Sequence, residues 1–145
     1  MMVEVNTLRE IAEKVAWSLH GLPYRWGGDD PMTGFDCSGL VVEILKSVGV
    51  LPRNGDWTAA GLYSRFAPLG KVEEPDSGCL VFWGNDRKIT HVEYCIGNGL
   101  TIGASGGGSA TTSDSAAAAQ NAYVKVRPIR DPYKYIVDPF YEVNE

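Results

Sequence analysis

The sequence predicts a single α+β domain in which N-terminal helices pack on an antiparallel sheet. Its 145 residues, with a mass of 15.7 kDa, suffice for one core of normal size. Apolar residues make up 44% and charged residues 21%, proportions that are typical of a folded globular chain. Helical periodicity occupies the first half of the sequence, and short apolar runs between turn signals occupy the second. This order indicates helices and strands that are segregated along the chain.

Three helices are expected in the first half. Residues 7–19 show one apolar stripe, and Thr7 and Glu10 at the start of this segment form a T-x-x-E capping box. Residues 37–48 are apolar around much of the helix circumference, so this helix should be central to the core. A shorter helix is expected over residues 57–66.

Strands are expected in the second half, where β-branched and aromatic residues alternate with turn signals. The hairpin signal is Gly-Asn-Gly at 97–99, and residues 106–122 between two strands predict a long mobile surface loop with a helical turn at 116–120. The C-terminal residues 128–145 should lie over the sheet rather than extend it. The expected strands are 79–83, 89–96, 100–105 and 123–129.

The charge pattern argues against two classes of partner. The chain carries 13 Lys and Arg residues against 18 Asp and Glu residues, for a formal net charge of −5, and it has no basic run. Such a chain is a poor ligand for nucleic acid or for an anionic membrane surface. No apolar run reaches the roughly 18 residues that a membrane-spanning helix needs, so membrane insertion is not expected. The oligomeric state stays open.

The three cysteines predict neither a disulfide framework nor a metal site, because their number is odd and no CxxC pair occurs. Cys79 and Cys95 fit small buried core residues. Cys37 differs, because it follows a glycine-rich loop and begins an apolar helix, whose free N–H groups stabilise a thiolate and can bind an oxyanion. His91 is the expected base, whereas His20 fits the end of the first helix.

Four short motifs in this order resemble the NlpC/P60 family of papain-like cell-wall peptidases. The resemblance covers about residues 7–127 and leaves residues 128–145 as a C-terminal extension. It implies the papain-like fold of that family, and the ordered set of motifs is hard to reach by chance. The motifs are PYRWGG at 23–28, DCSGLV at 36–41, SGCLVFW at 77–83 and HVEYCIGNG at 91–99.

The resemblance implies catalytic roles for three residues. Cys37 is the nucleophile, and His91 is first the general base and then the acid for the leaving amine. Tyr24 lines the site and helps to hold the tetrahedral oxygen together with the backbone N–H of Cys37. The reaction that the resemblance implies cuts the bacterial stem peptide between γ-D-glutamate and the diamino acid.

The resemblance also implies substrate contacts and no cofactor. Asp36 and Ser38 flank the nucleophile and contact the stem peptide, and Trp26 is a further candidate for substrate binding. Each has a structural alternative: Asp36 and Ser38 as helix caps, Trp26 and Tyr24 as loop aromatics packed on the core. No metal ion or organic cofactor is implied.

The sequence departs from the family at the group that orients the histidine. The family has a polar side chain twelve residues beyond the catalytic histidine, where this chain has Gly103. A backbone carbonyl or bound water is ranked first as a substitute, Ser105 second and Glu93 third. Ser105 faces His91 only if the hairpin turn has three residues, whereas a two-residue turn points it away. Glu93 shares a face with His91, and its ionised form would raise the pKa of the imidazole.

Two other functions stay open beside the peptidase. Without an orienting group the domain would be weakly active or inactive and would bind peptidoglycan or a partner. Alternatively, the same scaffold can serve as an amidase or act on another amide or thioester. The first residues, MMVEVNTLRE, lack the apolar stretch of a secretory signal. We therefore expect a bacteriophage or prophage lysin that reaches the wall by lysis or on a phage particle, or a secreted protein whose leader was removed.

Overall fold

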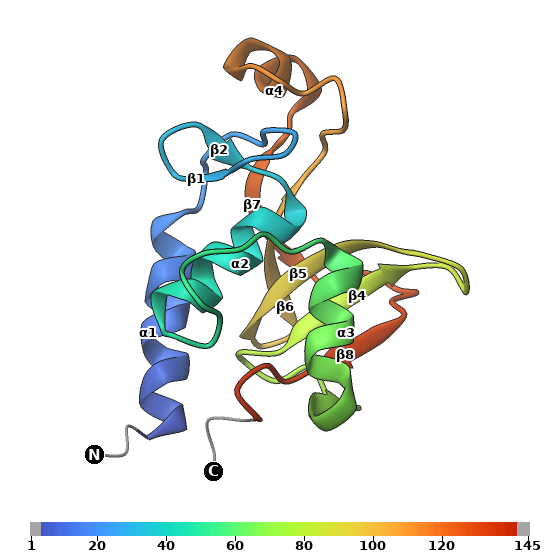
Figure 1. The fold of residues 1–145 in the computed structure, drawn as a ribbon. Helices are drawn as coiled ribbons and strands as arrows, with labels where there is room; N and C mark the ends of the chain where they lie inside the picture. Colours follow the sequence, from blue (N-terminus) through green and yellow to red (C-terminus); the bar gives the residue numbers. More distant parts are fainter. Residues whose placement is uncertain (1–3, 142–145) are drawn as a thin grey trace.

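The computed structural model describes residues 4–141, and within them helices cover an antiparallel sheet (Figure 1). The six-stranded sheet has the order β3-β8-β4-β5-β6-β7, in which every neighbouring pair is antiparallel. The α+β class predicted from the sequence is confirmed. The elements are α1 (Val5–Ser18), β1 (Asp29–Asp30), β2 (Gly34–Phe35), α2 (Cys37–Ser47), α3 (Ala59–Gly70), β3 (Lys71–Val72), β4 (Leu80–Gly84), β5 (Ile89–Gly97), β6 (Leu100–Ser105), α4 (Asp114–Gln120), β7 (Tyr123–Pro128) and β8 (Tyr135–Val137).

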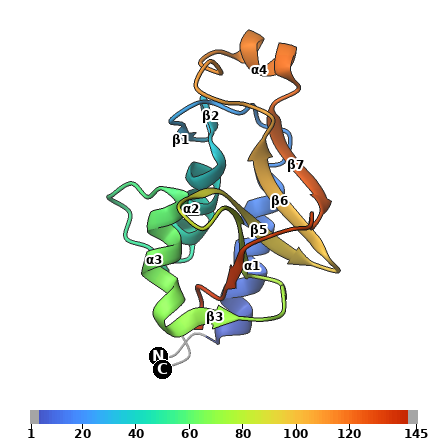
Figure 2. The same cartoon turned by 90° about the vertical axis from the view of Figure 1, so that its right-hand side faces the viewer.

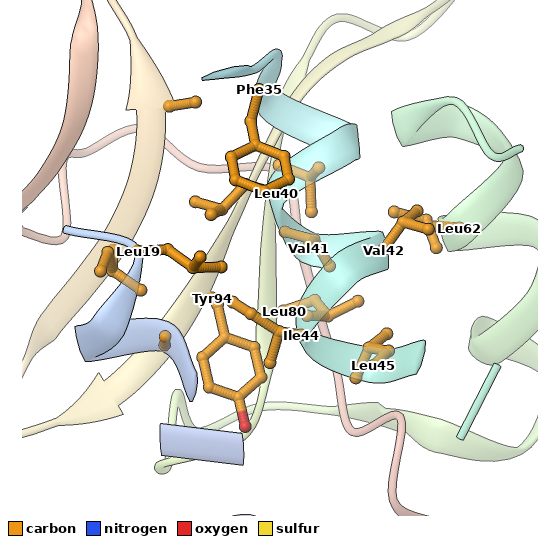
Figure 3. Packing of buried hydrophobic residues seen from close by; sticks show 14 of the residues in the cluster. Leu19, Phe35, Leu40, Val41, Val42, Ile44, Leu45, Leu62, Leu80 and Tyr94 are labelled. Carbon is orange, nitrogen blue, oxygen red and sulfur yellow. The ribbon is translucent and has the colours of Figure 1, made fainter. Parts of the chain in front are cut away.

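The core forms where α2 packs against the sheet, between α1 and α3 (Figures 1 and 2). Leu40 and Ile44 of α2 are fully buried, as are Leu80 and Tyr94 on the facing strands (Figure 3). Each such side chain stabilises the fold by roughly 1.5–3 kcal/mol through removal of apolar surface from water. Because most of the apolar residues of α2 are buried, the helix is firmly held against the sheet.

Helix α1 begins two residues before the predicted capping box. Its N-cap is Glu4, which makes no side-chain capping bond, and the N–H of Thr7 donates to the Glu4 carbonyl. The capping-box prediction for Thr7 and Glu10 is therefore wrong. The apolar stripe of this helix packs on the core through Ala12 and Ala16, which are fully buried.

The C-terminal segment extends the sheet, which corrects the prediction that it only covers it. Strand β8 lies between β3 and β4 and pairs with both. Ile136 on this strand is buried with Val81 and Cys79 in a second, smaller apolar cluster. The short alternation Tyr-Ile-Val is thus enough for a strand, because the exposed edge of β4 supplies the backbone partners.

The segment between β6 and β7 is anchored rather than free. It contains α4, where the sequence predicted a helical turn, and Ser113 caps that helix. The N–H of Trp26 donates to the Thr111 carbonyl at 2.7 Å, which ties the segment to the loop before α2. Strands β1 and β2, a small hairpin in that loop, were not predicted (Figure 1).

Among residues 4–141, no helix is long and apolar enough to cross a membrane.

Candidate active site

The start of α2 presents Cys37 at the surface of a helix whose apolar side is buried. Asp36 is the N-cap, and its Oδ1 accepts a hydrogen bond of 2.7 Å from the Gly39 N–H. The N–H of Asp36 in turn donates to the Gly28 carbonyl at 3.0 Å. A Cβ on Gly39 would lie 2.0 Å from that carbonyl oxygen, so glycine is required for the loop to approach the helix. This contact fixes the half-buried Cys37 at the positive end of the helix dipole.

Tyr24 lies in the loop before α2, where its backbone pairs with Phe35, and its charge interacts with that of Cys37. Its side chain is 6% exposed, and Gly107 packs so closely on the ring that a Cβ there would lie 2.3 Å from it. Burial, followed by the negative charges of Cys37 and Asp36, raises the pKa of Tyr24 to about 12. The hydroxyl therefore stays protonated at neutral pH and can donate a hydrogen bond to an oxyanion near Cys37.

His91 on β5 contacts an acidic residue and lies near the thiol. Its imidazole lies close enough to Cys37 for the two groups to interact electrostatically, and its Nε2 lies 2.6 Å from Oε2 of Glu93. Since a carboxylate only accepts, Nε2 carries the proton and Nδ1 is the nitrogen left for Cys37. Burial disfavours the charged imidazole, but the hydrogen bonds and charges of Cys37 and Glu93 outweigh it and raise the pKa of His91 to about 9.

The β5–β6 hairpin combines both turn lengths considered for it. Gly97 pairs with Leu100 across a two-residue turn, Asn98-Gly99, in which φ is +57° and +74°. A bulge between Cys95 and Gly97 then shifts the register by one residue, so that Cys95 pairs with Thr101. The register beyond the bulge is therefore the one expected for a three-residue turn.

Glu93 is the side chain in contact with His91, which corrects the expected order of substitutes. The hairpin register brings Ser105 to the predicted side of the sheet, but its Oγ accepts a hydrogen bond of 2.8 Å from Arg127 rather than meeting the imidazole. Glu93 reaches the imidazole because Gly103, beside it on β6, has no side chain to occupy the space. A residue ranked last from the sequence is thus the one that the tertiary structure places there.

Two arginines of this site were not identified from the sequence. Arg127 on β7 and Arg130 in the segment after it both donate to Oε2 of Glu93, at 2.9 and 2.8 Å. Arg130 also lies 4.9 Å above the ring of Trp83, which is 5.5 Å from the imidazole of His91. Nothing in their local sequence marks these arginines, because the contacts depend on strand order.

The three candidate substrate-binding residues lie in different environments. Ser38 is 9% exposed, and its hydroxyl donates to Asp36. Burial raises the pKa of Asp36, against hydrogen bonds from Gly39 and Ser38 that lower it. Trp26 is 54% exposed on the loop before α2. Asp36 and Ser38 therefore adjoin the nucleophile, whereas Trp26 is open to solvent.

Iodoacetamide at pH 7 is expected to modify Cys37 at least about tenfold faster than Cys79 or Cys95. Cys79 is 3% exposed and Cys95 is fully buried. Burial raises the pKa of Cys79 to about 12 and also raises that of Cys95. A time course followed by peptide mass spectrometry measures the three rates. Equal rates in the folded protein would contradict the assignment of Cys37 as the reactive thiol.

The sequence matches the model of the NlpC/P60 family over residues 21–128. One relative is the bifunctional muramidase/DL-endopeptidase CwlT of Bacillus subtilis (strain 168), which is 40% identical over 94 residues, covering 62% of this chain and 27% of CwlT. Another is the murein DD-endopeptidase MepH of Escherichia coli (strain K12), which is 42% identical over 87 residues, covering 57% of this chain and 31% of MepH. The chain thus spans less than a third of either relative.

The fold is also similar to solved structures. The crystal structure of the NlpC/p60 domain of the peptidoglycan hydrolase SagA superposes with a TM-score of 0.66 at 26% sequence identity. The superposition covers 89% of this chain and 97% of that domain. The similarity therefore extends over nearly the whole α+β architecture.

Proposed function

This chain belongs to the NlpC/P60 family, and we propose that it is a cysteine peptidase that hydrolyses an amide bond in the stem peptide of peptidoglycan. The observation that carries the proposal is that the Cys37 thiol, at the start of α2, and the His91 imidazole on β5 lie near enough to interact, with Glu93 bonded to the far nitrogen of the ring. A protonated tyrosine hydroxyl beside the same sulfur supplies a donor for the developing oxyanion. These are the nucleophile, base and oxyanion donor that acyl transfer requires.

The acylation step follows from this arrangement. The Cys37 thiolate attacks the amide carbon, a C–S bond forms, and the carbonyl electron pair moves to oxygen, where Tyr24 and the Cys37 N–H donate to it. The oxyanion then collapses, the C–N bond breaks, and the His91 imidazolium gives its proton to the leaving amine. The products are a thioester on Cys37 and a free amine.

Hydrolysis of the thioester regenerates the site. Neutral His91 removes a proton from water as the oxygen attacks the thioester carbon, and the C–S bond breaks to release a carboxylic acid. The thiolate and imidazolium are thereby restored. No co-reactant other than water is needed.

We assign the bond between γ-D-glutamate and the diamino acid as the one cleaved. Family resemblance supports this choice, as does the relative CwlT, which is named a DL-endopeptidase. The relative MepH is named a DD-endopeptidase, so the direct bond between two D-centres is the second candidate. The two bonds give products of different mass from the same muropeptide.

Digestion of purified monomeric and cross-linked muropeptides, read by mass spectrometry, tests this proposal. Cleavage of the γ-D-glutamyl bond releases a fragment that begins with the diamino acid, whereas DD-cleavage converts cross-linked dimers to monomers. Loss of the whole peptide from the sugar would identify an amidase instead. Retention on insoluble peptidoglycan with no new product, the same as in Cys37→Ala, would overturn the peptidase in favour of a binding domain.

A further inference from the structure

We infer that Glu93 is the positioning residue of His91 and that Gly103 is its complement, because the acid on β5 fills the space that a side chain at position 103 of β6 would need. The inference rests on the proposed function for its role in catalysis. The orienting group of this site therefore lies on β5, the strand that carries His91, rather than on the neighbouring strand β6.

The space is too small for both side chains. A Cβ built on Gly103 would lie 2.4 Å from Cγ, 2.6 Å from Cδ and 2.8 Å from Oε2 of Glu93. Carbon atoms that are not bonded do not approach this closely, so the ionised carboxyl and a side chain at 103 exclude each other in this geometry. Gly103, which lacks the family's orienting side chain, therefore makes room for the carboxyl of Glu93.

The surroundings of Glu93 keep its carboxyl ionised and fixed. The side chain is 1% exposed, and a buried carboxylate is costly unless it is paired and hydrogen-bonded. Oε1 accepts from the Thr101 hydroxyl at 2.6 Å, and Oε2 accepts from Arg127, Arg130 and His91. These partners outweigh the burial and lower the pKa of Glu93 to about 2. The ionised carboxyl of Glu93 is therefore a hydrogen-bond acceptor at neutral pH and well below it.

A fixed acceptor at Nε2 has two consequences for the imidazole. It holds the tautomer in which Nε2 carries the proton, so that neutral His91 presents its lone pair on Nδ1 to Cys37. It also stabilises the imidazolium that forms when His91 takes a proton. A purely structural role, in which Glu93 only neutralises Arg127 and Arg130, predicts neither effect.

Titration of His91 by ¹H–¹⁵N NMR tests the inference without a substrate. The chain has two histidines, and the exposed His20 provides reference resonances that should be the same in all variants at a given pH. In Glu93→Gln the titration of His91 is expected to move to lower pH, since the imidazolium loses an anionic partner while the arginines remain. Ser105→Ala, which loses a contact to Arg127 but none to His91, is the matched control and should leave the titration unchanged.

Kinetics and a strand-swap rescue test the role in catalysis. Glu93→Gln and Glu93→Ala are expected to lower kcat by about 10²–10⁴-fold with little change in KM, because the binding surface is kept. Glu93→Gly should be similarly impaired, and the double variant Glu93→Gly/Gly103→Glu should recover at least about tenfold of the lost activity, since the acid returns from the other strand. Thermal unfolding identifies variants that are folded, and only these are compared.

The results separate this inference from the proposed function. An unchanged His91 titration in folded Glu93→Gln, or activity in that variant within about threefold of the parent, would overturn the positioning role. A shifted titration in a protein that cleaves no muropeptide would support the positioning contact while overturning the peptidase. A double variant no better than Glu93→Gly would overturn the complementarity with Gly103.

Discussion

Cys37→Ala is expected to abolish hydrolysis of muropeptides, with a loss of at least about 10⁴-fold in kcat/KM, while Tm changes by no more than about 4 °C. The reason is that, in the proposed mechanism, the sulfur forms the bond to the substrate, and no other residue of the described site can replace it. The side chain is only half-buried at the start of α2, so its truncation leaves the helix cap and the core intact. Product masses and a thermal melt measure the two effects.

Cys79→Ala is the matched control for this variant. It removes a sulfur atom as well, but from the second apolar cluster behind the sheet. Hydrolysis should persist in it, and Tm should fall because a buried side chain is truncated. Turnover retained by Cys37→Ala would rule out the thiol mechanism. Loss of turnover in a folded Cys79→Ala, to the same level as in Cys37→Ala, would also rule it out.

His91→Ala is expected to be as damaging as the cysteine change, because in the proposed mechanism the imidazole both stabilises the thiolate and protonates the leaving amine. The two residues act as one unit, so the double variant Cys37→Ala/His91→Ala should be no slower than either single variant. Steady-state rates of the three proteins on one muropeptide measure this. Alkylation of Cys37 by iodoacetamide should also slow in His91→Ala, since the thiolate loses its cationic partner.

Ser105→Ala is the control for the histidine variant. Ser105 lies on the same side of the sheet but bonds to Arg127 and not to His91, so its loss should lower the rate by less than about threefold. An effect of Ser105→Ala comparable to that of His91→Ala would show that the hydroxyl, rather than Glu93, orients the ring. A fully active His91→Ala would exclude the imidazole as the base.

The pH dependence of the free energy of unfolding follows from two groups of the site. The pKa of His91 is raised to about 9, so the protonated imidazole stabilises the fold below its ordinary pKa, and this stabilisation is lost as the pH rises through 9. The pKa of Glu93 is lowered to about 2, so its pairing stabilises the fold above its ordinary pKa and is lost as the pH falls toward 2. Both contributions are present between about pH 5 and 6, where the unfolded imidazole is protonated and the unfolded carboxyl is ionised.

The sequence was a poor guide to several boundaries that depend on neighbours. Helix α1 begins before the capping box, and the Glu4 carbonyl accepts its first backbone bonds, from Thr7 and Leu8. The C-terminal segment was expected to lie over the sheet. Instead it forms β8 and joins the sheet, because the edge of β4 has unpaired backbone groups with which it can form hydrogen bonds. The hairpin register depends on a bulge at residue 96, which no local motif marks.

The sequence by itself determined the fold class, the family and the placement of Cys37 at a helix start. These features depend on local periodicity and short motifs, which can be read without knowing which distant residues come into contact. Only the tertiary structure decided what lies behind His91. Glu93, Gly103 and the arginines at 127 and 130 come together across three strands and the segment that follows them. Gly103 either leaves His91 without an orienting group or makes room for one from the neighbouring strand. Which of these holds depends on the side chain that β5 places opposite it, and the strand register determines that.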